Sequence, residues 1–158
     1  GRSLPAEVGQ KVALAILETH PGRFEVHEVE GVPVVVDGGH NAAGLSAALA
    51  GMRAAYGDRP LAVVFGVLRE KDAASMLAGL KDQANFILLT RPENDRAADP
   101  VLLEQGLLDH KEGTALVVED PVKALAVAVQ AVREVEGGVL VTGSLSTGAP
   151  VLRWLREA

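Results

Sequence analysis

Cysteine is absent from the 158-residue chain, which excludes a disulfide framework and any zinc site built on thiolates. Aromatic residues make up only 3% of the sequence, so the core has to be built from valine, leucine and alanine. Neither the first residues, GRSLPAEVGQK, nor any later stretch has an apolar run long enough for a signal peptide or a membrane span. We therefore expect a cytoplasmic protein without a membrane partner.

A basic stripe is also lacking, and the formal net charge is −6. Nucleic acids and anionic membranes attract clustered lysine and arginine, so neither is an expected partner. A nucleotide is compatible with this charge, because a small phosphate site needs only a few donors. The histidines show no paired metal-ligand spacing, which argues against a metal site in this chain; they are His20, His27, His40 and His110.

Three motifs of nucleotide-binding proteins and hydrolases are missing. The chain has no GxxxxGK[ST], so it lacks a P-loop, and no GxGxxG, so it lacks the dinucleotide fingerprint. It has no GxSxG, the nucleophile elbow of many hydrolases. A phosphoryl-transfer loop, where one is needed, therefore has to come from outside this sequence.

The chain does contain an alternation of apolar strands and amphipathic helices, and 48% of its residues are apolar. The patterns predict strands at 24–29, 32–38, 61–67, 85–90, 114–119 and 138–144. They predict helices over 5–19 and 41–56, and from Asp72, Asp99-Pro100, Asp120-Pro121 and Pro150 onward. We expect residues 1–158 to form a single Rossmann-like α/β domain with a layered architecture. Its sheet should have about six mostly parallel strands, one antiparallel edge strand and helices on both faces.

Local signals refine this arrangement. Glu30-Gly31 is a turn that pairs the first two strands as an antiparallel hairpin, and Gly137-Gly138 is expected to end the helix before the last strand. The helices have apolar sides, which we expect to face the sheet. These sides carry Leu45, Leu49, Met52 and Tyr56; Met76, Leu77 and Leu80; Val122, Leu125, Val129 and Val132; and Leu152 and Leu155.

Polar segments follow several predicted strands, and ligands of parallel α/β sheets bind beyond the carboxyl ends of the strands. DGGHN follows the second strand, LREKD the third, residues 90–95 the fourth and TGSLSTG the last, whereas PGRFE precedes the first strand. We expect these segments to converge on one edge of the sheet. They supply the candidate site residues Arg23, Asp37, His40, Asn41, Lys71 and Ser144.

Each of these residues also has a purely structural explanation when it is taken alone. Asp37 can be a turn residue, His40 a local hydrogen-bonding side chain and Lys71 a solvated cation. Ser144 can satisfy backbone groups at a strand end, and Arg23 can be an ordinary surface residue. Their joint placement after strands of one sheet favours a functional site.

The segments PGRFEV, DGGHN, VFGVLREKD and VTGSL, in this order and spacing, resemble one family. It is the C-terminal domain of folylpolyglutamate synthase and dihydrofolate synthase, within the Mur ligase superfamily of ATP-dependent amide-bond-forming enzymes. The resemblance covers nearly the whole chain from Pro21 onward. It implies a three-domain enzyme whose N-terminal ATPase domain, absent from this chain, bears the P-loop, the Mg²⁺ ligands and a modified lysine.

The resemblance also implies the reaction. ATP phosphorylates a carboxylate of a folate or of dihydropteroate, and the amino group of L-glutamate attacks the acyl phosphate. Arg23 matches the family arginine that reaches ATP, and a guanidinium fork suits phosphate oxygens. Asp37 matches the family aspartate at the nucleotide, where its carboxylate would accept hydrogen bonds from ribose hydroxyls.

The remaining candidates are assigned by the resemblance to the amino-acid end of the site. His40, as the catalytic residue, and Asn41 match positions near the terminal phosphate and the incoming glutamate. Lys71 and Ser144 would bind the glutamate carboxylates. The domain would thus act as a lid that closes over the ATPase domain and positions ATP and glutamate. Alone, it is expected to be inactive.

Two alternatives stay open at this point. One is a stand-alone module that binds a nucleotide or an amino acid without chemistry. The other is a sister ligase that extends a peptidoglycan precursor, against which PGRFE and DGGHN argue. The chain departs from the family pattern at His20 and Ser146, where aromatic residues are common, and at Ala42, where proline is common. These departures bear on loop shape and substrate preference.

Overall fold

The computed structural model describes residues 23–107 and 114–157. Its elements are β1 (Glu25–Val29), β2 (Val32–Val36), α2 (Ala42–Tyr56), β3 (Leu61–Phe65), α3 (Ala73–Lys81), β4 (Phe86–Leu89), α4 (Pro100–Gln105), β5 (Thr114–Val117), α5 (Pro121–Arg133), β6 (Gly138–Thr142) and α6 (Leu145–Glu157). The helix predicted over 5–19, together with His20 and His110, lies outside the described residues. The other predicted strands and helices are present in the predicted order.

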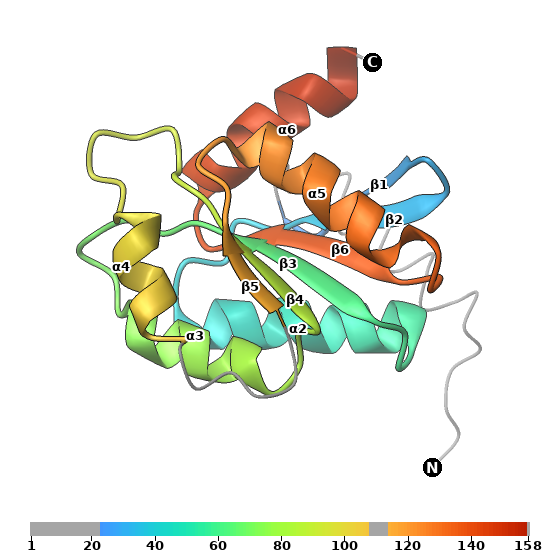
Figure 1. Cartoon of the computed structure of the whole chain (residues 1–158), viewed down its shortest axis with the longest axis horizontal. Coiled ribbons are helices and arrows are strands. Elements are labelled where there is room, and N and C mark those ends of the chain that lie inside the picture. Colours follow the sequence, from blue (N-terminus) through green and yellow to red (C-terminus); the bar gives the residue numbers. More distant parts are fainter. Residues whose placement is uncertain (1–22, 108–113, 158) are drawn as a thin grey trace.

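The strands of the described chain form one six-stranded sheet in the order β1-β2-β6-β3-β4-β5. β1 and β2 are antiparallel and every other neighbouring pair is parallel, which confirms the predicted sheet and its antiparallel edge. Figure 1 shows α2 and α3 below the sheet and α5 and α6 above it. β6, the last strand in sequence, lies between β2 and β3. The strand order therefore brings the carboxyl ends of β2, β6 and β3 side by side.

The hairpin of β1 and β2 turns at Glu30-Gly31, as predicted. Both residues have positive φ, 51° and 81°, which gives a tight two-residue turn whose twist matches that of the strands. β1 alternates between half-buried and exposed residues, whereas β2 is buried almost throughout. β1 is therefore the outer strand, and the interior of the domain begins at β2.

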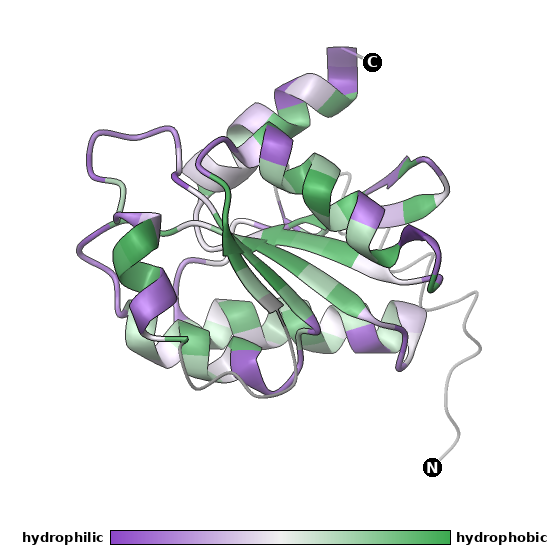
Figure 2. Ribbon diagram, viewed as in Figure 1, coloured by the Kyte–Doolittle hydropathy of each residue, from purple (hydrophilic) through white to green (hydrophobic). Residues whose placement is uncertain are grey.

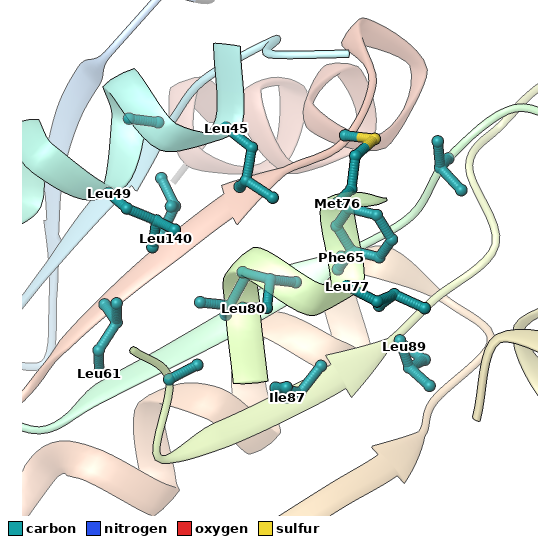
Figure 3. Packing of buried hydrophobic residues seen from close by; sticks show 14 of the residues in the cluster. Leu45, Leu49, Leu61, Phe65, Met76, Leu77, Leu80, Ile87, Leu89 and Leu140 are labelled. Atoms are coloured by element: carbon teal, nitrogen blue, oxygen red, sulfur yellow. The ribbon is translucent and has the colours of Figure 1, made fainter. Parts of the chain in front are cut away.

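The sheet separates two apolar layers. Figure 3 shows the layer beneath it, in which side chains of α2 and α3 pack on alternate residues of the strands: Leu45, Leu49, Leu61, Phe65, Met76, Leu77, Leu80, Ile87, Leu89 and Leu140. The other layer joins α5 and α6 to the opposite face of the strands through Val34, Val36, Val64, Leu125, Val129, Val132, Val141 and Val151. Figure 2 shows the central strands as hydrophobic, as expected where both faces are covered.

Four described helices begin with a capping side chain. Asn41 Oδ1 accepts a hydrogen bond from the Gly44 N–H at the start of α2. Asp72, Asp99 and Asp120 accept hydrogen bonds from N–H groups in the first turns of α3, α4 and α5. In α4 and α5 a proline follows the cap, as the Asp-Pro pairs predict. The caps satisfy N–H groups that have no partner within the helix.

The prediction that the last helix begins at Pro150 is wrong, because α6 already begins at Leu145. Pro150 lies inside α6, where it has no N–H to offer the carbonyl of Ser146, four residues earlier. That carbonyl instead accepts a hydrogen bond from the backbone N–H of Glu93, at 3.1 Å. A loop distant in sequence thus supplies the bond that the proline cannot make.

Smaller differences concern the ends and sides of helices. Val122, Tyr56 and Leu155 are half-buried rather than buried. Tyr56 and Leu155 nevertheless pack against the two apolar layers from their margins. The end of α5 is predicted at Gly137-Gly138, but the helix already ends at Arg133. Gly138 is instead the first residue of β6. The sequence pattern therefore places the helices correctly and their margins less well.

The turn after β6 depends on Gly143. Its φ is 106°, a conformation that residues with a side chain rarely adopt. A Cβ on this residue would lie 2.1 Å from the carbonyl oxygen of Gly66. The Gly143 N–H donates to the Gly39 carbonyl at 3.1 Å, and the Gly66 N–H donates to the Thr142 carbonyl at 3.3 Å. These contacts hold the loops after β2, β3 and β6 against one another.

We expect Gly143→Ala to lower the free energy of unfolding by about 3 kcal/mol or more, because it adds a clash to a strained φ. Gly57→Ala is the matched control, since φ there is +67° but no atom lies within 4 Å of the added Cβ. The control should cost about 1–2 kcal/mol, from the backbone alone. Urea unfolding followed by the fluorescence of Trp154, the single tryptophan, measures both losses. Equal losses would contradict an energetic role for the Gly66 contact.

Asp72 caps α3 with both carboxylate oxygens. Oδ2 accepts from the Ser75 hydroxyl at 2.6 Å, and Oδ1 accepts from the Ser75 backbone N–H at 3.2 Å. These two bonds, the hydroxyl bond foremost, hold the pKa of the Asp72 carboxyl below its ordinary value of 3.8. Because the folded-state pKa is lowered, the cap stabilises the fold fully above about pH 4 and loses this effect as the pH falls through the folded-state pKa.

We expect Asp72→Ala to lower the melting temperature at neutral pH, and to lower it less in acid than at about pH 7. Asp72→Asn is the control, because its amide oxygen can accept a hydrogen bond and does not titrate. The advantage of the asparagine variant over the alanine variant should therefore persist in acid. Thermal unfolding followed by circular dichroism across this pH range measures the three proteins. A loss for Asp72→Ala that is independent of pH would contradict the ionised cap.

Candidate functional site

The candidate site lies where the loops after β2, β6 and β3 meet. The three strands are neighbours in the sheet, and the backbone bonds at Gly39, Gly66 and Gly143 join their loops directly. The segments at 37–41, 66–72 and 142–147 therefore converge on one edge of the sheet, as the sequence predicts. We call this edge the carboxyl edge.

Asp37 stands at the end of β2 and is half-buried. Its N–H donates to the Val141 carbonyl of β6 at 2.9 Å. Its Oδ1 accepts from the Gly39 N–H at 2.8 Å, and its Oδ2 accepts from the Phe24 N–H at 3.0 Å. Each carboxylate oxygen has two lone pairs, so the group can still accept hydrogen bonds from a ligand. The turn role that Asp37 has when taken alone is real, and it leaves capacity for binding.

Arg23 is exposed and immediately precedes Phe24. Since the N–H of Phe24 bonds to Asp37, residues 23–25 are held beside the DGGHN turn that begins at Asp37. The structure thus brings Arg23 and Asp37, the two residues predicted for the nucleotide, to the same place. A guanidinium beside a carboxylate with free lone pairs can bind phosphate and hydroxyl groups of one ligand.

His40 and Asn41 are both exposed at the start of α2. Asn41 Oδ1 is used in capping, at 2.7 Å from the Gly44 nitrogen, which leaves the amide NH₂ as a donor. The first turn of α2 carries no acidic residue. Its N–H groups and the positive end of the helix dipole therefore favour an anion beside these two side chains.

Lys71 lies in the loop after β3 and is half-buried. Its backbone N–H donates to the Leu68 carbonyl at 3.1 Å, which closes a turn. The same loop is tied to the 90–99 loop, because the Arg69 N–H donates to the Arg96 carbonyl at 2.8 Å and Arg96 pairs with Glu70 at 2.7 Å. The position of Lys71 is thus set by two loops together.

Ser144 follows the Gly143 turn and is only 5% exposed. Its Oγ accepts from the Ser146 N–H at 3.0 Å, so its structural role at a strand end is also real. Because that bond uses the oxygen as an acceptor, the hydroxyl hydrogen remains available for a carboxylate. Ser144 is therefore the most enclosed of the six candidates, whereas Arg23, His40 and Asn41 are exposed.

Three further polar residues of the predicted segments lie at this edge, although the sequence does not single them out as candidates. Thr147 Oγ1 donates to the Gly66 carbonyl at 2.8 Å, and Asn94 Nδ2 donates to Ser146 Oγ at 3.3 Å. Thr142 is fully buried, and its hydroxyl finds no partner among the residues that the structure describes. A threonine at the end of an otherwise apolar strand is the signal that marks Thr142. Asn94 lies in the segment 90–95, which is also predicted at this edge, and its contact with Ser146 shows that the segment reaches the loop after β6.

Within residues 23–107 and 114–157, no group of three or more histidine and acidic side chains is arranged to hold a metal ion. No helix in the same residues is long and apolar enough to cross a bilayer.

Comparison with known proteins identifies relatives that share the fold. A probable bifunctional folylpolyglutamate synthase/dihydropteroate synthase of Halobacterium salinarum is 35% identical over 147 residues, which are 92% of this chain and 18% of that protein. A folylpolyglutamate synthase of Mycobacterium tuberculosis, complexed with ADP and AMPPCP, superposes with a TM-score of 0.78 at 26% identity. The match covers 86% of this chain and 32% of the solved one.

A third relative is a bifunctional folylpolyglutamate synthase/dihydrofolate synthase with manganese, AMPPNP and L-glutamate bound. It has a TM-score of 0.74 at 28% identity, over 87% of this chain and 32% of its own. The chain thus spans about a fifth of the curated relative and about a third of the solved ones. The profile of the family described as Mur ligase, glutamate ligase domain, matches residues 22–145, and the protein therefore belongs to this family.

Proposed function

We propose that the chain is the C-terminal domain of an ATP-dependent ligase that adds L-glutamate to a folate or to dihydropteroate. The observation that carries the proposal is the Asp37 carboxylate. It accepts hydrogen bonds from Phe24, the neighbour of Arg23, and from Gly39 in the DGGHN turn before α2. Relatives of this fold bind ADP, AMPPNP and L-glutamate. The same ligand classes fit an edge that offers a guanidinium, a carboxylate, a helix N-terminus and the half-buried Lys71.

In the proposed reaction, a carboxylate of the pterin substrate takes the terminal phosphoryl group of ATP, and ADP forms. The amino group of L-glutamate then attacks the acyl carbon and loses a proton. Inorganic phosphate leaves as the amide bond forms. Arg23 would bind phosphate oxygens of ATP, and Asp37 would accept hydrogen bonds from its ribose hydroxyls.

The glutamate end of the proposed site lies at the start of α2 and in the loops after β3 and β6. His40 would act beside the terminal phosphate and the attacking amino group, where an imidazole can accept a proton. Asn41 would donate its free amide hydrogens. Lys71 and Ser144 would bind the glutamate carboxylates, the first by charge and the second through its hydroxyl hydrogen.

The P-loop and the magnesium ligands would belong to another domain of the enzyme. Magnesium supplies charge neutralisation for the phosphates when ATP binds. We propose that residues 1–158 form one domain, which closes over the ATPase domain as a lid and is inactive alone. Both ATP and free glutamate are cytoplasmic metabolites, so we propose that the enzyme works in the cytoplasm. Below, the complete ligase means the enzyme that contains this chain together with its ATPase domain.

Substitution of Asp37 tests the nucleotide role. We expect Asp37→Ala to lower kcat/KM for ATP of the complete ligase by about 10- to 100-fold, the loss typical of a charged hydrogen-bonding group. Thermal unfolding should still show a folded domain. Asp58→Ala is the matched control, because Asp58 is an exposed aspartate just before the amino end of β3, at the end of the strands opposite to the carboxyl edge. Unchanged KM and kcat for Asp37→Ala would remove Asp37 from the site.

Substrate competition tests the reaction class. The complete ligase should form an amide product from L-glutamate, ATP and a folate or dihydropteroate, and it should leave a muramyl nucleotide unchanged. Mass spectrometry of the products measures both reactions. Consumption of the muramyl nucleotide with an inert folate would assign the protein to the peptidoglycan branch. Binding of ATP and glutamate with no product from either acceptor would favour a binding module.

A further inference from the structure

Phe24 has an unusual backbone. Its φ is +49°, a conformation that is rare for a bulky aromatic residue and costs free energy. The residue lies between Arg23 and the first residue of β1. Its conformation therefore decides the direction in which the chain, and with it Arg23, leaves the sheet.

Two contacts hold Phe24 in this conformation. Its backbone N–H donates to Asp37 Oδ2 at 3.0 Å. Its ring packs against the core layer of α2 and α3 and lies over Gly51, in the middle of α2. A Cβ built on Gly51 would lie 2.5 Å from Cε2 and 2.9 Å from Cζ of the ring. The ring can therefore occupy this place only because residue 51 has no side chain.

A glycine in the interior of a helix is unfavourable by about 1 kcal/mol relative to alanine, so Gly51 needs an explanation. Simple burial of Phe24 does not provide one, because the ring is only half-buried at the margin of the apolar layer. A residue with ordinary backbone angles could cover the same margin. What the Phe24–Gly51 contact adds is a fixed position for the segment that carries Arg23.

We propose that Gly51 and Phe24 are positioning residues for the nucleotide. The ring seated over Gly51 and the bond from Phe24 to Asp37 together fix Arg23 at the carboxyl edge. This inference rests on the proposed function, in which Arg23 binds phosphate oxygens of ATP. Gly51 lies ten residues along α2 from Asn41 (51 − 41), or about 15 Å, so it acts on the site without touching the ligand.

The test compares four variants of the complete ligase and a fifth that tests for rescue. Gly51→Ala displaces the ring, Arg23→Ala removes the guanidinium, and the double variant combines them. Gly79→Ala is the matched control, since it also replaces a helical glycine but has no atom within 4 Å of the new Cβ. KM is measured separately for ATP and for L-glutamate, with kcat and the melting temperature of each variant.

We expect Gly51→Ala to raise KM for ATP about ten-fold, to leave KM for glutamate unchanged and to melt near the parent temperature. The control should change neither KM. The double variant should be no worse than Arg23→Ala alone, because both changes remove the same interaction. Adding Phe24→Leu to Gly51→Ala should recover part of the ATP affinity, since the shorter side chain avoids the new methyl group.

Hydrogen exchange of the Phe24 amide makes the same comparison without measuring turnover. The amide hydrogen of Phe24 is held by Asp37, so Gly51→Ala should speed its exchange with solvent, whereas Gly79→Ala should not. Unchanged KM for ATP in Gly51→Ala, alongside a raised KM in Arg23→Ala, would overturn the positioning role and leave the proposed function intact. Unchanged kinetics in Arg23→Ala would instead overturn the nucleotide role of Arg23. A loss in Gly51→Ala shared equally by both substrates, with a lower melting temperature, would also overturn the positioning role.

Discussion

The carboxyl edge depends on how closely the backbone after β6 approaches its two neighbours. β6 lies in the middle of the sheet, so its turn is the one that the loops after β2 and β3 can both touch. Gly143 makes that approach possible, because a side chain at this position would collide with the Gly66 carbonyl. The backbone N–H of Gly143 in turn donates to the Gly39 carbonyl. Backbone hydrogen bonds thereby join three segments that are far apart in sequence, and these segments carry the polar side chains of the carboxyl edge.

At this edge, side chains that bond to the backbone keep further hydrogen-bonding capacity. Asp37 bonds two backbone N–H groups and keeps lone pairs for a ligand, and Ser144 accepts one backbone bond and keeps a hydrogen to donate. Asn41 caps α2 through its oxygen and keeps its amide hydrogens. The bonds to the backbone fix the direction of each group before a ligand arrives, so binding loses less side-chain freedom.

Most of the fold could be predicted because its signals are local. Valine-rich strands, apolar helix sides and the pairs Asp99-Pro100 and Asp120-Pro121 mark their elements within a few residues. Contacts between distant residues could not be predicted in this way. Pro150 predicts a helix start on local propensity, whereas α6 already begins at Leu145 and the Glu93 N–H, distant in sequence, bonds to the Ser146 carbonyl that Pro150 leaves without a helical donor. The candidate site residues could likewise be named from their motifs, and their roles stay a prediction, whereas the contact of Phe24 with Gly51 has no signal in the sequence.

The helix caps have a consequence for the electrostatics of the edge. Asp72, Asp99 and Asp120 place a carboxylate on the positive ends of α3, α4 and α5, and these three helix dipoles are thereby neutralised at their origin. The cap of α2 is Asn41, which carries no charge. Of these four capped helices, α2 alone keeps an uncompensated positive end. An anion at this end of α2 would therefore be favoured by oriented backbone amides in addition to the nearby cationic side chains, in a chain whose net charge is negative.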